Sequence, residues 1–217
     1  MAAQRSFPYP NKCPRKDNSI KKMIRVFSIL CKTLLEKLSD VEIFKKATDE
    51  FDHYNESCPS CGAFGKLSPC GSYSRDLVSY EDGVTVDSRV SPRRFKCASC
   101  GATHALLPDI LIPYSPYSLR FKLTALTAYF DKDTIVSAVC ERFGIAISTL
   151  YSWKKLLLEH KELLLGIIVS QKESATFFIQ SLLLSPCLSE RLSSFFRRHA
   201  FSFMQRMPLT ATRSLPP

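Results

Sequence analysis

Apolar residues recur every three to four positions in the N-terminal part of the chain, which is the spacing of an amphipathic helix. The series runs from Ile20 to Val41 and includes Ile24 and Phe27. A break is expected at Ser39-Asp40, followed by a second helical piece. We therefore predict a helical segment over residues 20–52 that covers the core of its own domain.

The pattern changes to a period of two after this segment. Val84, Val86 and Val90 alternate with polar residues, as in a strand with one buried face. Asp82-Gly83 comes just before this strand, and both central positions of a two-residue hairpin turn favour positive φ, which suits these residue types. The sequence predicts a β-hairpin inside a ribbon module over residues 53–107.

Helical periodicity returns in the second half of the chain. The prolines of residues 108–118 oppose helix formation, and we interpret this stretch as a connector at a domain boundary. The predicted division is a poorly ordered N-terminus at 1–19, helices at 119–165 and 166–209, and a polar tail at 210–217. The expected fold class is α+β and mostly α, with a small β-module followed by helices.

Two C-x-x-C pairs flank the predicted hairpin. Each pair is followed by a glycine, which permits the tight backbone turn of a metal knuckle. Four thiolates complete a tetrahedral shell, so we expect a Zn²⁺ site without an open position for substrate water. Its contribution is then to fold a module that has little core of its own. The predicted ligands are Cys58, Cys61, Cys97 and Cys100.

Alternatives to this zinc site remain open from the residues alone. A redox pair fits two separated C-x-x-C motifs poorly, whereas iron in a shell of four sulfurs is the main chemical rival. Cys70 and His104 lie near the knuckles, and we expect a small core residue and a surface or second-shell residue respectively. The remaining thiols are expected to be buried or unpaired: Cys13, Cys31, Cys140 and Cys187.

Residues 136–155 follow the pattern of two packed helices joined by a tight turn. Gly144 is expected to end the first helix in a left-handed conformation. The apolar contacts between the helices are assigned to Val139, Phe143, Ile145, Leu150 and Trp153. The second helix then leaves a polar face free, as a recognition helix in the major groove of DNA does. The candidate DNA contacts on that face are Ser148, Thr149, Tyr151, Ser152 and Lys155.

Charge supports a polyanionic partner without naming it. Thirty Lys and Arg residues against twenty Asp and Glu residues give a net charge of +10, which favours phosphate contacts. Arg93 and Arg94 add a basic rim to the predicted ribbon, although a solvated strand edge is an equally good interpretation. No export signal or membrane span is evident, so a cytoplasmic, nucleoid-associated protein is expected.

The ribbon and the helix-turn-helix, in this order, resemble the N-terminal region of bacterial insertion-sequence transposases. The likeness is carried by residues 93–97 (RRFKC), 100–108 (CGATHALLP) and 149–155 (TLYSWKK). Over about residues 40–205 the chain is similar to an uncharacterised, clostridial, transposon-associated family of unknown function. This resemblance implies DNA binding in a mobile element and no established activity.

A transposase of the RNase H type needs spaced acidic residues that hold two metal ions. Beyond the helix-turn-helix only four glutamates occur, and no aspartate. We therefore expect a non-catalytic protein that binds double-stranded DNA. The alternative is an adaptor that docks on a transposase or recombinase through residues 195–201, where aromatic and arginine side chains are grouped. Single-stranded DNA or RNA binding by aromatic stacking is a weaker third hypothesis.

Overall fold

The computed structural model describes residues 23–26, 37–131, 134–165, 174–186 and 188–206. The expected N-terminal disorder and the polar tail lie outside these residues. The strands are β1 (Ile24–Val26), β2 (Leu67–Ser72), β3 (Arg75–Glu81), β4 (Val84–Val90), β5 (Arg93–Cys97) and β6 (Thr103–Pro108). The helices are α2 (Asp40–Asp49), the 3₁₀ turn η1 (His53–Asn55), α3 (Leu119–Phe130), α4 (Val136–Phe143), α5 (Ile147–Leu165), α6 (Ala175–Leu183) and α7 (Leu188–His199). The predicted α+β class is confirmed.

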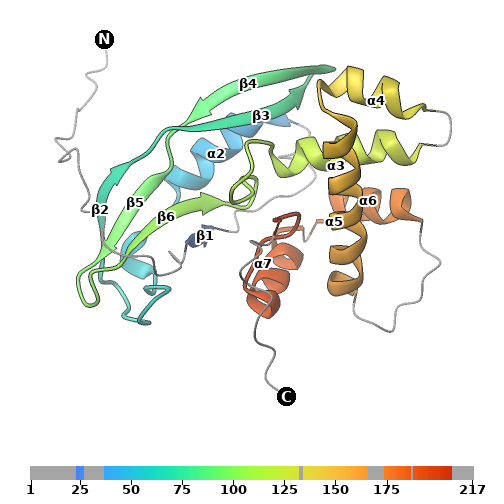
Figure 1. Ribbon diagram of the computed structural model, residues 1–217. Coiled ribbons are helices and arrows are strands. Elements are labelled where there is room, and N and C mark those ends of the chain that lie inside the picture. The colour runs from blue at the N-terminus through green and yellow to red at the C-terminus, as the bar shows by residue number, and fades with distance from the viewer. Residues whose placement is uncertain (1–22, 27–36, 132–133, 166–173, 187, 207–217) are drawn as a thin grey trace, which may run out of the picture.

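The β-region is a long, bent ribbon with the cysteine knuckles at one end and α4 at the other (Figure 1). Its first half is a four-stranded sheet in the order β1-β6-β5-β2, and its second half is the two-stranded β3-β4 arm. The arm turns at Asp82 and Gly83, with φ of 49° and 87°. These positive values confirm the hairpin turn predicted from the Asp-Gly pair.

The prediction of a helix through the N-terminal series is wrong at residues 24–26. These residues form β1, which pairs in parallel with β6 so that Ile24 lies opposite Leu106. Two of its three residues are β-branched, which suits a pleated strand, and pairing with a distant strand overrides the local helical periodicity. The second helical piece is present as α2. Ser39 caps it, accepting the Glu42 N–H in a reciprocal capping box.

The helix-turn-helix is formed by α4 and α5, which pack on α3. Gly144 ends α4 with φ of 63°, and its N–H bonds to the Cys140 and Glu141 carbonyls, as expected for a left-handed helix end. The five apolar residues assigned to the contact between these helices are all buried, Leu150 completely. The arm reaches this unit, because Thr85 Oγ1 donates to the Phe143 carbonyl at 3.2 Å.

One hydrophobic cluster includes residues of the arm, the helices and the segment between them. Residues 108–113, which begin the stretch interpreted as a connector, are all buried. Ile110, Leu111 and Ile112 belong to the same cluster as Leu77 of β3 and Phe121 of α3. Pro108 ends β6 and residues 109–113 continue through the core, whereas Tyr114 and Pro116 further along the predicted connector are exposed.

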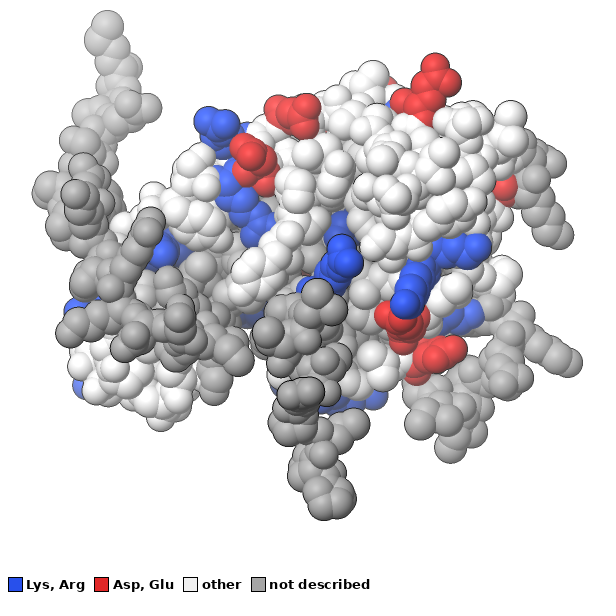
Figure 2. Space-filling model, in the orientation of Figure 1, with Lys and Arg blue, Asp and Glu red and all other residues white. Residues whose placement is uncertain are grey.

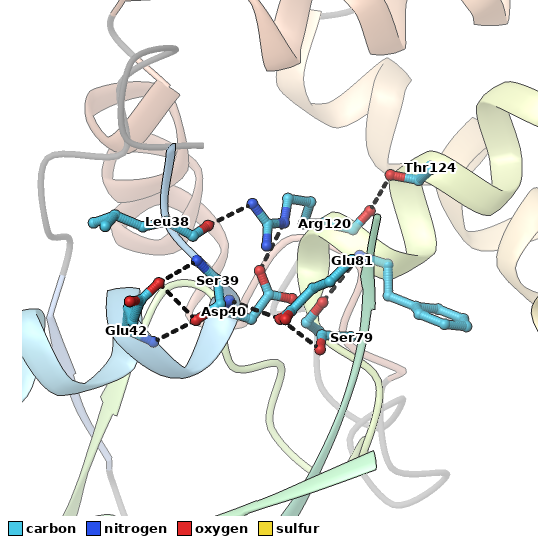
Figure 3. A network of polar contacts seen from close by, with 10 residues as sticks. Leu38, Ser39, Asp40, Glu42, Ser79, Glu81, Arg120 and Thr124 are labelled. Carbon is cyan, nitrogen blue, oxygen red and sulfur yellow. Dashed lines mark hydrogen bonds and ion pairs between the residues drawn. The ribbon is translucent and has the colours of Figure 1, made fainter. Parts of the chain in front are cut away.

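A buried ion pair joins α2 to α3 (Figure 3). Arg120 Nε lies 2.7 Å from the Asp40 carboxylate, which is fully buried. The Arg120 guanidinium also donates to the Leu38 carbonyl, and the backbone N–H of Asp40 donates to Glu81 of β3. Burial raises the pKa of Asp40, and the charge of Arg120 opposes that rise. The network therefore connects the N-terminal helix, the arm and the helix beneath the helix-turn-helix.

A membrane-crossing segment would need a long and largely apolar helix. None of the helices in the described ranges has that combination of length and composition.

Candidate metal centre and nucleic-acid interface

The four predicted cysteines meet at the end of the ribbon that is remote from α4. Cys97 ends β5 and lies opposite Leu67 of β2, and this strand pairing brings the second knuckle beside the first. The knuckles have the same backbone turns. Gly62 N–H donates to the Cys58 carbonyl at 2.8 Å, and Gly101 N–H donates to the Cys97 carbonyl at 2.9 Å. Both glycines have positive φ, of 74° and 71°, which is the conformation the sequence pattern requires there.

The sulfur positions fit one tetrahedral metal ion. All four Sγ atoms lie within 4.8 Å of one another, and the Cys58–Cys100 and Cys61–Cys97 pairs are each 3.7 Å apart. A Zn–S bond of about 2.3 Å in a tetrahedral shell separates neighbouring sulfurs by about 3.8 Å. Cys58 and Cys97 are buried while Cys61 and Cys100 are exposed. The four cysteines are therefore placed to hold a metal ion at the surface of the ribbon.

Hydrogen-bond donors surround the buried sulfurs. Backbone N–H groups of Cys100 and Ser99 lower the pKa of the Cys97 thiol to about 6, because they stabilise the thiolate. The Ser60 N–H points at Cys58 Sγ from 3.4 Å. Such donors favour the deprotonated sulfurs that metal binding needs.

His104 lies directly behind the metal centre. It is buried, on β6, with Nε2 at 3.3 Å from Cys58 Sγ. The sequence left two positions open for His104, one in contact with a predicted metal ligand and one at the surface. The contact with Cys58 agrees with the first, and the burial of His104 shows that the surface position is wrong. Cys70, the other residue near the knuckles, is half-buried on β2 and is not one of the clustered thiols. Cys140 is buried as expected, whereas Cys13, Cys31 and Cys187 lie outside the described residues.

The two arginines of the predicted basic rim have different surroundings. Arg93 forms an ion pair with Asp49 at the end of α2, with N and O atoms 3.0 Å apart. Arg94 lies over the Tyr73 ring, 5.7 Å from its centre. Adjacent residues of a strand point to opposite faces, so the structure does not combine these arginines into one patch. Of these two arginines, only Arg94 forms no ion pair within the part of the chain that the structure describes.

The predicted DNA-contacting side chains lie together on the first three turns of α5. Ser148, Tyr151, Ser152 and Lys155 are exposed and Thr149 is half-buried. Trp153 on the opposite face is buried against Tyr117 and Phe121. Lys155 is largely exposed and pairs with Glu159 one turn later, at 3.8 Å. Figure 2 shows basic side chains over the middle of α5, with acidic ones beside them toward its C-terminal end.

A groove that the sequence pattern did not predict adjoins this face of α5. It lies between the segment 113–117 and α5, has a volume of about 470 Å³, and includes Lys122 and Arg206 in its lining. No local pattern predicts this neighbourhood, because its walls come from three separate parts of the chain. The only signal was the group of prolines and tyrosines at 113–117, in which Tyr114 adopts a left-handed backbone conformation with φ of 61°.

Comparison with protein families matches residues 58–153 to a family described as a domain of unknown function, DUF6431. The matched region begins at Cys58, the first of the four clustered cysteines, and ends at Trp153 in the second helix of the helix-turn-helix. Metal centre, arm and helix-turn-helix therefore occur within one matched unit. Comparisons with curated proteins and with solved structures find no match.

Proposed function

We propose that this chain is a non-catalytic protein that binds double-stranded DNA, with α5 as its recognition helix and a zinc-stabilised ribbon as its scaffold. In the mobile-element setting that the sequence resemblance implies, it serves as an accessory or regulatory factor. The contacts that read base edges are assigned to Ser148, Thr149, Tyr151 and Ser152, and Lys155 contacts phosphate.

The main support for this proposal is that α5 has one buried face and one exposed polar face. Leu150, Trp153 and Leu157 are buried, which fixes the helix on its own domain. The exposed side chains of its first turns include Ser148, Tyr151, Ser152 and Lys155, and the first of them lies four residues after Gly144. Small polar groups near the N-terminal end of an exposed second helix are the arrangement that enters a major groove.

The metal in this proposal is zinc in a structural role. A shell of four cysteines leaves no coordination position for a substrate or a reactive water. Sulfur chemistry alone allows iron as well, and a colourless protein with stoichiometric zinc distinguishes the two. The ribbon then provides Arg94 as a supplementary phosphate contact, while Arg93 is engaged by Asp49.

The proposal is tested by fluorescence anisotropy of the metal-loaded full chain with a labelled random-sequence duplex, followed by selection of bound sequences. Wild type is expected to bind in a salt-dependent manner. Lys155→Gln lowers affinity on all sequences and reduces the salt slope by about one, whereas Ser148→Ala and Ser152→Ala change the selected sequence.

Two matched variants serve as controls. Lys45→Gln removes the same charge from an exposed position on α2 and is expected to leave binding unchanged. Glu159→Gln frees Lys155 from its neighbour and removes a negative charge, so it strengthens binding. Absence of duplex binding at low salt by a zinc-loaded preparation refutes the proposed function.

The adaptor alternative loses part of its basis in the structure. Phe195, in the group of aromatic and arginine residues that favoured it, is fully buried and packs on His160 and Phe203. That side chain serves the core of the C-terminal helices, so it is not available as an interface anchor.

A further inference from the structure

The groove beside the recognition helix has a cationic floor. Lys122 of α3 is buried within it, with Nζ 3.3 Å from the Met204 carbonyl and 5.4 Å from the centre of the Trp153 ring. Arg206 lines the same groove and is exposed. None of the described residues that line the groove is acidic.

The positive charges of Lys122 and Arg206 are not neutralised by an ion pair within the described residues. Burial and, to a smaller extent, the charge of Arg75 together lower the pKa of Lys122 to about 8. Arg75 itself donates to the Ile112 and Ser115 carbonyls and so holds the segment that forms the groove wall. Among the ion pairs found in the described ranges, none involves Lys122, Arg75 or Arg206. An anion in the groove would offset the cost of burying the Lys122 ammonium.

The groove walls add hydroxyl groups and aromatic rings. Ser148, Thr149 and Ser152 of α5 line one side, and Tyr114 and Tyr117 line the other. Trp153 also borders the space, next to the Tyr117 ring at 4.9 Å. Hydroxyls bind phosphate or base edges, and aromatic side chains stack on flat bases. A volume of about 470 Å³ is within the usual range of small-ligand sites, about 300–1,000 Å³.

We propose that this groove binds one nucleotide, with Lys122 and Arg206 as counter-charges to its phosphate and the tyrosines of segment 113–117 against its base. The chemistry is that of a nucleoside monophosphate, either an unpaired nucleotide of bound DNA or a free mononucleotide. This inference rests on the proposed DNA-binding function only for the first of these sources. Ser148 and Ser152 then face both the duplex and the extra nucleotide.

Trp153 provides a direct readout because it is the only tryptophan in the chain and lies in the groove wall. Its fluorescence is followed while the metal-loaded full chain is titrated with deoxyadenosine monophosphate, with inorganic phosphate, and with duplexes that are blunt or carry one unpaired terminal nucleotide. The mononucleotide is expected to change the emission and to bind more tightly than phosphate. Preference for the duplex with the unpaired nucleotide identifies DNA as the source.

Lys122→Met removes the ammonium and keeps an apolar stem of similar length, so the buried position stays filled. Loss of a charge-assisted contact is expected to weaken mononucleotide binding by about tenfold or more. Arg206→Gln, at an exposed position, tests the same site if the first variant fails to fold. Lys155→Gln is the control, because it weakens duplex binding and leaves mononucleotide binding unchanged.

The outcomes separate this inference from the proposed function. Salt-dependent duplex binding with no tryptophan response to the mononucleotide overturns the groove assignment and leaves the recognition helix intact. Equal affinity for phosphate and the mononucleotide overturns the role given to the aromatic wall. A mononucleotide response in a protein that binds no duplex supports the groove and refutes the DNA-binding proposal.

Discussion

Arg120 Nε lies 2.7 Å from the carboxylate of Asp40, and this contact joins the N-terminal helix to the helix on which the helix-turn-helix packs. Asp40 is fully buried and the Arg120 side chain is 15% exposed. Asp40→Ala leaves a buried guanidinium without its counter-charge, and removing one partner of such a pair costs about 3–5 kcal/mol. The free energy of unfolding from denaturant titration is expected to fall by that amount.

An exposed pair gives the matched control for this prediction. Asp49 and Arg93 are 71% and 50% exposed, and Asp49→Ala is expected to cost at most about 1 kcal/mol. The double variant Asp40→Leu with Arg120→Met, which replaces both charges by apolar groups, should recover most of the lost stability. A single Asp40→Ala variant as stable as Asp49→Ala would contradict the assignment.

Substitutions of the clustered cysteines are expected to lower the metal content of the protein, whereas substitution of a cysteine outside the cluster is not. Cys58→Ser removes one of four converging sulfurs, and the purified variant is expected to retain less than one ion per chain. Because a closed thiolate site supplies folding energy, the ribbon also loses β-structure, measured by circular dichroism. Cys70→Ser is the control, since this half-buried thiol lies outside the cluster. Equal metal content in both variants would refute the four-cysteine site.

His104 is expected to act on the metal through Cys58. Its Nε2 is 3.3 Å from the Cys58 sulfur, and loss of a residue in this supporting position typically lowers metal affinity by about 10–100-fold. His104→Ala is therefore predicted to keep one ion per chain and to release it more readily to a chromophoric chelator. His104→Gln retains a hydrogen-bond donor, so its metal affinity should lie between those of wild type and His104→Ala. A variant that loses the ion altogether would identify His104 as a ligand.

Local signals account for the features that the sequence predicted correctly. The knuckles depend on two-residue cysteine gaps followed by glycine, and the arm depends on the Asp82-Gly83 turn. The inner face of the helix-turn-helix follows from the spacing of residues such as Leu150 and Trp153. Each of these patterns is complete within a short continuous stretch of the chain, so its physical cause is visible in the sequence.

Features that depend on distant partners were not predictable in this way. Residues 24–26 carry a helical spacing, and only their pairing with β6, some eighty positions later, makes them a strand. Prolines in 108–118 indicated a connector, yet Ile110 to Ile112 face a core built by distant elements. The separation of Arg93 from Arg94 and the burial of Lys122 depend likewise on tertiary contacts.

His160 is predicted to make the protein less stable in mild acid. Burial, followed by the charges of His199 and Lys122, lowers its pKa from an ordinary value of 6.5 to about 4. Its Nδ1 accepts the Met204 N–H at 2.9 Å, which requires that nitrogen to be unprotonated. Between pH 6.5 and 4 the unfolded state binds a proton that the folded state resists. The contribution of His160 is therefore complete above the unfolded pKa and is lost as the pH falls toward 4.

A shift of this size corresponds to at most about 3 kcal/mol over the whole interval. Denaturant titrations of wild type and His160→Gln across the interval isolate it, because the two proteins differ at this side chain alone. The stability difference between the two is expected to shrink steadily as the pH falls. If the two curves stay parallel from neutral pH to pH 4, the buried imidazole is not the source of the acid sensitivity, and its contact with Met204 would have to survive protonation.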